Sequence, residues 1–285
     1  MKTRTFLGFA APSIGAMVAL MAVPLAATVW LSLHVVTFRG EWRFAGLLQY
    51  EATLEDPDFW RALSFTLVFL AFSVPAKLLI GFAMALALDK VTRGWRAIFV
   101  AAALLPFIVT PVVGTLAFSW LFRDFGVVNW WITQATGLRI FWFGSEAWAR
   151  ALVVLHDVWQ GAPFATIVLF AGLQTLSKDQ LEAAIVDGAN VWYRLRYIVL
   201  PHLRSLFVFL ALMMLMDGYR VFDSIAVMTK GVNGTESVMY YNYRVAIVEN
   251  AVARGAAISM LTVLGILVLL LPFLVLTWRE QKEKR

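Results

Sequence analysis

The sequence predicts an all-α membrane protein with six transmembrane helices, and two observations support this fold class. Of its 285 residues, 61% are hydrophobic and 15% are charged, whereas soluble domains have about 45–50% and about 25%. The apolar residues gather in runs that reach the roughly 20 residues a helix needs to cross a bilayer. The runs are also continuous, unlike the alternating strands of a β-barrel. We therefore expect a single transmembrane domain over residues 1–285.

Six apolar runs are long enough to be spans. They are residues 6–33, 63–88, 97–122, 151–173, 206–228 and 256–278. The first run is longer than the apolar region of a signal peptide and has no small-residue cleavage site, so we expect it to be retained. Four of the five later runs contain proline, as does the first run, and proline is tolerated in spans because neighbouring groups satisfy the freed backbone carbonyls.

The charge distribution orients these spans. With a cytoplasmic N-terminus, the cytoplasmic segments carry thirteen basic and six acidic residues, from Lys2 and Arg4 to Lys284 and Arg285, and the external segments carry nine of each. The cytoplasmic side therefore carries +7, the external side 0 and the spans −1, which sum to the net charge of +6. The whole positive excess lies on one side, as the positive-inside rule requires. This favours both termini in the cytoplasm and explains the basic charge without a nucleic-acid partner.

Tryptophans and external loops complete the topology. Trp30, Trp60, Trp95, Trp120 and Trp278 lie at span edges, where aromatic belts form. Residues 124–148 indicate an interfacial helix plus loop, and residues 230–254 are polar enough to reach a soluble partner. A simple solvated loop is the alternative for each.

The longest cytoplasmic connection, residues 174–204, indicates a helical hairpin. Ser177 and Gln180 form a capping-box pattern at the start of a first helix. Gly188 is expected to break that helix, because glycine adopts conformations that side chains forbid. Asn190 can cap a second helix, which Pro201 is expected to stop. The hairpin has a small-residue face at Ala183 and Ala184, so it suits a docking partner, with an elbow on the lipid surface as the alternative.

The hairpin also carries a family resemblance. It contains Glu182-Ala183-Ala184, followed by Gly188 after three residues, Ile198 after nine more and Leu200-Pro201 after one more. This pattern resembles the EAA signature of binding-protein-dependent ABC importer permeases. The resemblance extends over nearly the whole chain and is strongest to the first permease subunits of maltose and glycerol-phosphate uptake systems. It departs at Gly231-Val232-Asn233, where the family usually has Gly-Gly-Pro.

This resemblance implies a function and a set of partners. The hairpin would insert into a cytoplasmic ATPase, and the coupling residues would be Glu182, Ala183, Ala184, Asp187, Gly188, Ile198, Leu200 and Pro201. The partners would be a second homologous permease, an ATPase dimer, an extracytoplasmic solute-binding protein, a sugar or sugar derivative and the lipid bilayer of the bacterial inner membrane. The chain itself would hold no cofactor, because ATP and Mg would bind to the ATPase.

Polar residues within the spans predict a solute pathway, because ionisable groups are costly inside a membrane and usually have a functional role there. Asp157, Trp159 and Gln160 lie in the fourth run, and Asp217, Arg220 and Asp223 recur at near-helical spacing in the fifth. The alternative is a structural ion pair, such as Arg220 with either aspartate. Lys77 in the second run is more easily explained as a snorkelling or helix-paired lysine.

The family places the sugar along the fourth and fifth spans. Together the two arguments give the predicted substrate set Asp157, Trp159, Gln160, Gly161, Phe164, Met214, Asp217, Gly218, Arg220, Val221 and Asp223. Arg220 beside the cavity would suit an anionic sugar derivative.

Other function classes are disfavoured. The chain has no cysteine, no Gly-rich phosphate loop and no HExxH or GxSxG motif, so we expect neither catalysis nor a metal site. His156 and Asp157 point about 100° apart on a helix and do not form a dyad. An ion-coupled secondary transporter that uses Asp157, Asp217 and Asp223 is the remaining alternative, although no inverted repeat is evident.

Overall fold

The computed structural model describes residues 3–36 and 41–283, and it is helical nearly throughout. Lys2, Lys284 and Arg285, which contribute to the predicted charge asymmetry, lie outside the described residues, as do the side chains of Arg4 and Trp278. The chain divides into two compact units, one formed by residues 1–60 and 241–269 and the other by residues 61–240 and 270–285.

The first unit begins with α1 (Thr3–Ser32), a helix long and apolar enough to span a membrane from Ala11. An antiparallel hairpin of β1 (His34–Val36) and β2 (Trp42–Phe44) follows, and then α2 (Leu48–Leu54) and the start of α3 (Pro57–Lys90). The C-terminal part of this unit holds η2 (Arg244–Val248) and most of α13 (Val252–Glu283).

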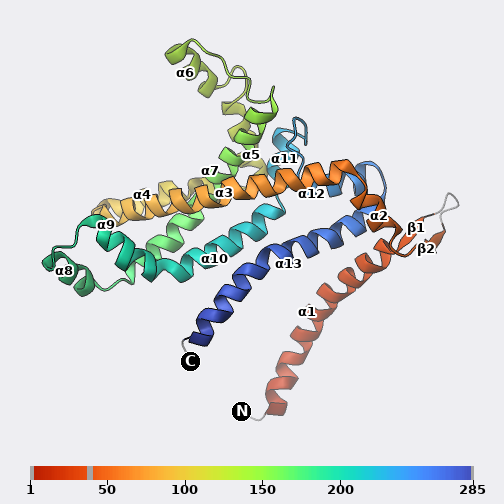
Figure 1. Ribbon diagram of the computed structural model, residues 1–285, viewed down its shortest axis with the longest axis horizontal. Helices are drawn as coiled ribbons and strands as arrows, with labels where there is room; N and C mark the ends of the chain where they lie inside the picture. Colours follow the sequence, from red (N-terminus) through yellow and green to blue (C-terminus); the bar gives the residue numbers. More distant parts are fainter. Residues whose placement is uncertain (1–2, 37–40, 284–285) are drawn as a thin grey trace. The chain divides into compact units, whose positions relative to one another are not determined.

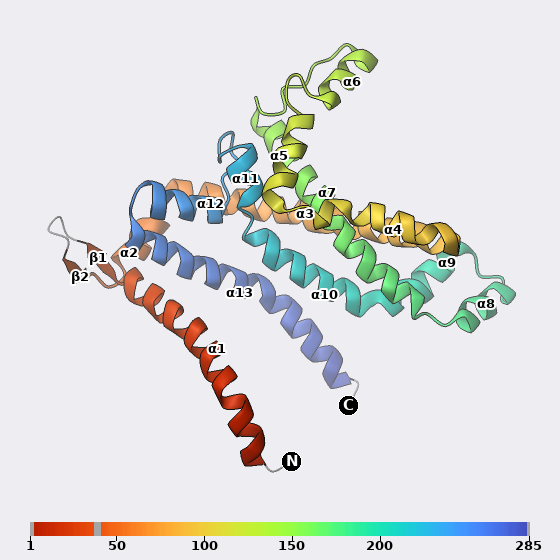
Figure 2. The same ribbon diagram turned by 180° about the vertical axis from the view of Figure 1, so that it is seen from behind.

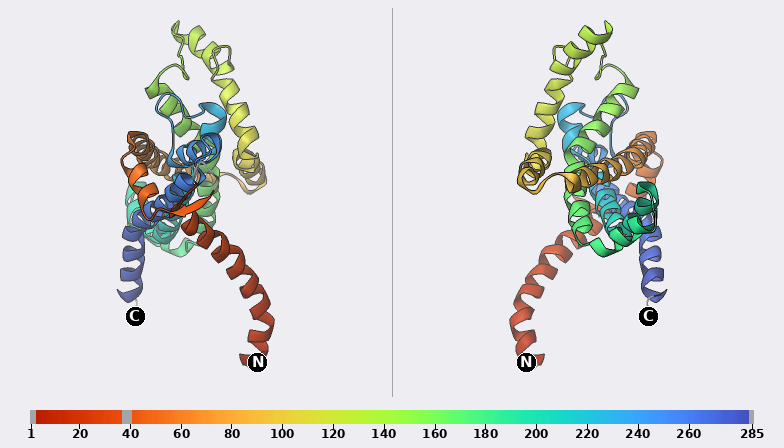
Figure 3. Two further views of the ribbon diagram at one scale, coloured as in Figure 1. Left: turned by 90° about the vertical axis from the view of Figure 1, so that its right-hand side faces the viewer. Right: turned by 90° about the vertical axis from the view of Figure 1, so that its left-hand side faces the viewer.

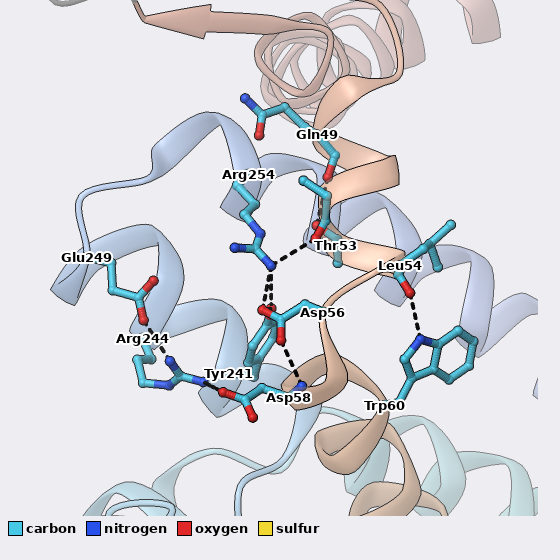
Figure 4. A network of polar contacts seen from close by, with 11 residues as sticks. Gln49, Thr53, Leu54, Asp56, Asp58, Trp60, Tyr241, Arg244, Glu249 and Arg254 are labelled. Atoms are coloured by element: carbon cyan, nitrogen blue, oxygen red, sulfur yellow. Dashed lines mark hydrogen bonds and ion pairs between the residues drawn. The ribbon is translucent and has the colours of Figure 1, made fainter.

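A polar network joins the segment before α3 to the segment that leads into α13 (Figure 4). Arg254 Nη2 donates to Asp56 Oδ2 at 2.6 Å, and the Tyr241 hydroxyl donates to the same oxygen at 2.8 Å. Burial raises the pKa of Asp56, but hydrogen bonds from the Asp58 backbone N–H, Tyr241 and Arg254, together with the Arg254 charge, outweigh it and lower that pKa. Burial and the bond to Asp56 raise the pKa of Tyr241.

The second unit contains most of α3 together with the helices that follow it up to α12. In chain order these are α4 (Arg93–Ile108), α5 (Pro111–Leu121), α6 (Val127–Thr136), α7 (Glu146–Gln174), α8 (Lys178–Val186), α9 (Val191–Arg194), η1 (Leu195–Val199), α10 (Leu200–Tyr219), α11 (Asp223–Met228) and α12 (Val238–Tyr243). Within this unit α4 and α10 pack against α7, and α11 packs against α5 and α7. Helix α7 is therefore the centre of the unit (Figure 1).

The predicted spans are confirmed as helices with two differences. Five helices of the described residues are long and apolar enough to cross a membrane, and the count is six if one bent pair is a single span. That pair is α4 and α5, which the sequence presented as the single run 97–122 and which meet at an angle of 97° (Figure 3). The break lies directly before Pro111, because proline disfavours the helical conformation of the residue before it.

The fifth predicted run, 206–228, is also divided. Helix α10 ends at Tyr219, and α11 begins at Asp223. Asp223 is therefore not on the same helix as Asp217 and Arg220, and the near-helical spacing expected for these three residues is wrong.

The predicted aromatic belt agrees with the helix ends. Trp30 lies near the end of α1, Trp60 and Trp95 lie in the first turns of α3 and α4, and Trp120 lies near the end of α5. All four are exposed in the isolated chain, as expected for side chains that meet lipid headgroups.

Candidate functional site

The second unit has an open cavity of about 450 Å³ among its span helices, lined by apolar side chains together with four charged ones, which we call the inner cavity. This volume falls in the range of about 300–1,000 Å³ that is typical of small-molecule sites. Its lining comes from α3, α4, α5, α7 and α10 and comprises Lys77, Phe107, Pro111, Asp157, Gln160, Gly161, Phe164, Met213, Met214, Met216, Asp217 and Arg220.

A buried ion pair forms one wall of the inner cavity. Lys77 Nζ on α3 lies 2.7 Å from Asp157 Oδ2 on α7, and the lysine side chain is only 3% exposed. The aliphatic part of Lys77 passes over Gly161, where a Cβ atom would lie 2.5 Å from Lys77 Cδ. Gly161 is thus required for this lysine to cross α7 and reach its partner.

The opposite wall carries two charges without ion-pair partners. Asp217 and Arg220 both line the inner cavity from the end of α10, and both are exposed in the isolated chain. Within the described residues neither side chain forms an ion pair, so the structural pair predicted as an alternative for Arg220 is not present. The lining therefore holds two basic and two acidic side chains and has no net charge.

An aromatic pair completes the inner cavity. The rings of Phe107 on α4 and Phe164 on α7 are stacked, with centroids 5.5 Å apart and planes at 18°. Phe107 and Pro111 stand on the two sides of the α4–α5 bend, so this bend supplies part of the cavity wall. Such a surface can cover the apolar face of a sugar ring while carboxylates, amides and a guanidinium bind its hydroxyl groups.

The structure brings together seven of the eleven predicted substrate residues in this cavity. The four others lie elsewhere. Trp159 packs on Phe118, Gly218 is buried beside Leu70, Val221 is only partly buried and does not line the cavity, and Asp223 starts α11.

Sequence reasoning missed Lys77, Phe107, Pro111, Met213 and Met216 as lining residues. Lys77 sits mid-span, and its pattern is more easily explained by a snorkelling or helix-paired lysine than by a ligand. Its partner Asp157 comes from another helix. A single charged side chain in a span is costly when it has no partner. The presence of one lysine and one aspartate in two different spans could therefore have suggested that they pair.

The predicted hairpin is present as α8 and α9, and both helices lie at the end of the second unit remote from α6 (Figure 2). Gly188 has φ of +79°, in the left-handed region. The Gly188 and Ala189 N–H groups donate to the carbonyls of Ile185 and Ala184 at 3.0 and 2.8 Å. This is a Schellman ending of α8 and confirms the expected role of Gly188.

The caps of the two helices differ from each other. Asn190 caps α9, as predicted, because its Oδ1 accepts the Tyr193 N–H at 2.8 Å. Ser177 precedes α8 in extended backbone but makes no capping hydrogen bond with its side chain. The predicted capping box is therefore not formed.

Pro201 does not end the second helix, contrary to expectation. The helix continues from α9 through η1 into α10, and the whole segment Val191–Tyr219 passes as one candidate span. The Leu200 N–H bonds to the Leu195 carbonyl, five residues earlier. This π-helical turn loosens the helix where Pro201 lacks an N–H and would otherwise crowd the preceding turn.

The hairpin exposes several large apolar and aromatic side chains. No residue of α8 or α9 is buried, and Val186, Val191 and Trp192 are 87%, 70% and 70% exposed. A groove of about 480 Å³ lies between the two helices and is lined by Ala184, Asp187, Gly188, Ala189, Asn190, Tyr193, Arg194, Tyr197 and Ile198. Exposed apolar patches of this kind mark interaction sites.

The remaining hairpin residues of the predicted set lie around that groove. Glu182 and Ala183 are exposed on α8, Leu200 is half-buried at the start of α10, and Pro201 is exposed beside it. At the base of the hairpin a hydrogen bond of 3.0 Å joins Thr175 Oγ1 and His202 Nε2. The described residues include no group of three or more histidine or acidic side chains that could hold a metal ion.

Comparisons with known proteins agree with this architecture. The family model described as "binding-protein-dependent transport system inner membrane component" matches residues 17–285. The trehalose/maltose transport system permease protein MalF of Thermococcus litoralis is 32% identical over 88% of this chain and 86% of its own length. The trehalose transport system permease protein SugA of Mycobacterium tuberculosis is 33% identical over 88% and 81%.

A solved structure shows the same fold. It is that of a bacterial ABC transporter involved in the import of the acidic polysaccharide alginate, with a TM-score of 0.84 and 21% identity, over 97% of this chain and 96% of that chain. These matches favour the ABC permease over the ion-coupled alternative. The chain belongs to the family of binding-protein-dependent transport system inner membrane components and is a multi-pass permease subunit of an ABC transporter.

Proposed function

We propose that this chain forms half of the translocation pathway of an ATP-driven importer for a neutral oligosaccharide, and that the inner cavity is where the sugar binds. The observation that carries this proposal is the cavity itself, which combines an aromatic pair, an amide and balanced charges within span helices. The relatives named for trehalose and maltose support disaccharides of this kind as the first solutes to test.

The balance of charges favours a neutral solute over the anionic one that Arg220 alone suggested. Asp157 neutralises Lys77 directly at 2.7 Å. Asp217 lies three residues before Arg220, on the same side of α10. An anionic sugar would gain from Arg220 but would meet Asp217 beside it, whereas hydroxyl groups can use both side chains.

The hairpin is proposed as the contact with the cytoplasmic ATPase. Its exposed aromatic groove and its rigid glycine ending support a docking role, as the signature residues Glu182 to Pro201 imply. In this arrangement ATP and Mg bind to the ATPase dimer and not to this chain. A second homologous permease and an extracytoplasmic binding protein complete the importer. The alginate transporter has been solved with its periplasmic protein bound.

The topology follows from the charge distribution of the sequence. Both termini and the hairpin face the cytoplasm, and the segments around α6 and between α11 and α12 face the outside. The basic residues Arg194, Arg196 and Arg204 near the hairpin support this orientation.

Uptake of radiolabelled trehalose into proteoliposomes that contain the complete importer tests the proposal. We expect uptake to require ATP and the binding protein and to resist ionophores. Gln160→Ala should raise the apparent KM about tenfold, the effect of losing one hydrogen bond of about 1.5 kcal/mol. Val221→Ala, outside the cavity, serves as the matched control. Equal uptake by Gln160→Ala and wild type, or uptake of glucuronides in preference to trehalose, would contradict the proposal.

A further inference from the structure

A second cavity, which we call the outer cavity, lies at the other end of α5 and α7 and has a volume of about 530 Å³. Its walls are three loops of the second unit, which follow α5, precede α7 and follow α11. Arg123, Asp124, Phe125, Phe141, Thr229 and Asn233 are among its lining residues. None of these residues belongs to the predicted substrate set.

The loops of the outer cavity are held in place by hydrogen bonds that do not use its charged groups. Asn233 Nδ2 donates to the Phe143 carbonyl at 2.7 Å, and Arg150 Nε donates to the Gly234 carbonyl at 2.8 Å. Arg139 Nη2 donates to the Asp124 carbonyl at 2.9 Å. The cavity is therefore preorganised, which lowers the entropic cost of binding a ligand.

The charged side chains that line the outer cavity remain available to a ligand. Within the described part of the chain, the carboxylate of Asp124 and the guanidinium of Arg123 make no hydrogen bond or ion pair, although Arg123 lies over the Trp120 ring. Phe125 and Phe141 expose their rings beside them. This combination of one acid, one base and two rings repeats the chemistry of the inner cavity.

An aromatic cluster lies on α5 and α7 between the stretches of these helices that line the two cavities. Phe118, Phe122 and Leu152 are buried together, and the Phe118 and Phe122 rings stack at 4.7 Å. Phe143 and Met228, which line the outer cavity, pack against this cluster. Pro111 lines the inner cavity at the first residue of α5, whose 11 residues span about 16 Å. The two cavities thus lie along the same pair of helices, and the buried cluster lies at an intermediate position on those helices.

We propose that the outer cavity is a separate binding site for the neutral sugar, occupied before the Phe118–Phe122 cluster opens. This inference rests on the proposed function and deepens it by adding a site on the extracytoplasmic side. Hydroxyl groups of the sugar bind to Arg123 and Asp124, and its apolar face packs on Phe125 or Phe141. A pocket that receives a side chain of the binding protein is the competing use of the same surface.

The absence of cysteine from the chain allows a direct test by site-specific labelling. Val232→Cys reports on the outer cavity, because Val232 lines it and is 59% exposed. Met213→Cys reports on the inner cavity, and Glu55→Cys, on an exposed residue outside both, is the control. Each cysteine variant is assembled with cysteine-free partner subunits into the complete importer in nanodiscs. The importer is then labelled with a maleimide, with and without trehalose.

We expect trehalose alone to slow labelling of Val232→Cys at least several-fold and to leave Glu55→Cys unchanged. Adding Asp124→Asn should remove the protection at Val232→Cys and preserve it at Met213→Cys. Protection at Met213→Cys alone would overturn this inference and leave the proposed function standing. Protection at neither position would overturn both. Protection at Val232→Cys by the binding protein, but not by trehalose, would identify a docking pocket and also overturn the inference.

Discussion

The inner cavity and the hairpin of α8 and α9 are held in shape by different means. The cavity is held by side chains, since a buried ion pair crosses from α3 to α7 and a glycine makes room for it. The hairpin has no buried residue in α8 or α9, and its shape comes from the backbone, through the left-handed Gly188 and the Asn190 cap.

This difference shows what each region needs from its surroundings. A charged side chain within span helices is costly unless it pairs with another group or lines a water-filled cavity, and Lys77 and Asp157 pair with each other. The hairpin leaves its tryptophan, tyrosines and valines exposed, and exposed apolar patches of this kind are typical of interaction sites. Variants of the two regions should therefore fail differently, the first in stability and solute affinity and the second in coupling.

The largest expected effect is on the cavity side, from removal of the lysine. Lys77→Met leaves Asp157 uncompensated in a span, which should cost about 3–5 kcal/mol of unfolding free energy. The double variant Lys77→Met with Asp157→Asn should recover most of that loss, because no lone charge remains. Thermal unfolding in nanodiscs measures both. If the single and double variants are equally unstable, the pair does not act as a unit.

The next effect isolates the hairpin. In Gly188→Pro, the proline cannot adopt φ of +79° and lacks the N–H that bonds to the Ile185 carbonyl. The hairpin conformation should therefore become about 3 kcal/mol less favourable, which corresponds to a roughly 100-fold loss of uptake. Gly188→Asn is the matched control, since asparagine tolerates the left-handed region. Neither variant should change the affinity for sugar at the inner cavity. A changed affinity would show that the two regions are not separable.

A smaller effect is expected from one methyl group in the cavity wall. Gly161→Ala places a Cβ against Lys77 Cδ and should cost about 1–3 kcal/mol through overpacking. Gly114→Ala, on α5, meets its nearest neighbours at 3.5 Å or more and should be tolerated. Comparing their melting temperatures tests whether Lys77 must cross α7 at this glycine. Equal losses for both variants would contradict that role.

The smallest effect is expected for Asp56, which belongs to neither the inner cavity nor the hairpin. Asp56 has a lowered pKa in the folded state, so its contribution to stability is present above its ordinary pKa of 3.8 and is lost as the pH falls through the folded value. Asp56→Asn should cost about 1 kcal/mol at pH 7. Melting curves of the variant and wild type should converge below pH 4. A constant difference across that range would show that the carboxylate charge is not involved.

The sequence predicted the spans well because each depends on a local property, the length of an apolar run. It failed where a helix changes direction or continues unexpectedly. The run 97–122 bends by 97° before Pro111, yet Pro201 is passed without a stop. Whether a proline breaks a helix depends on whether the preceding turn can relax, here as the π-turn η1, and that relaxation has no local signature.

The candidate site was predictable where its residues share one helix. Asp157, Gln160, Gly161 and Phe164 follow helical spacing on α7, and all four line the inner cavity. The contributions of α3 and of the α4–α5 bend were not predictable in this way. Lys77 reaches Asp157 from 80 positions earlier in the chain, and Phe107 enters through the α4–α5 bend. These contacts depend on tertiary packing, which no spacing rule encodes.

One measurement tests most directly whether solute binding and ATPase coupling reside in separate regions. Binding-protein-stimulated ATP hydrolysis and trehalose uptake are measured together in proteoliposomes for Gly188→Pro and Gln160→Ala. The account predicts that Gly188→Pro loses both the stimulated hydrolysis and uptake. Gln160→Ala should keep the stimulated hydrolysis and lose uptake at low trehalose concentration. Stimulated hydrolysis and uptake both at wild-type levels in Gly188→Pro would contradict the account.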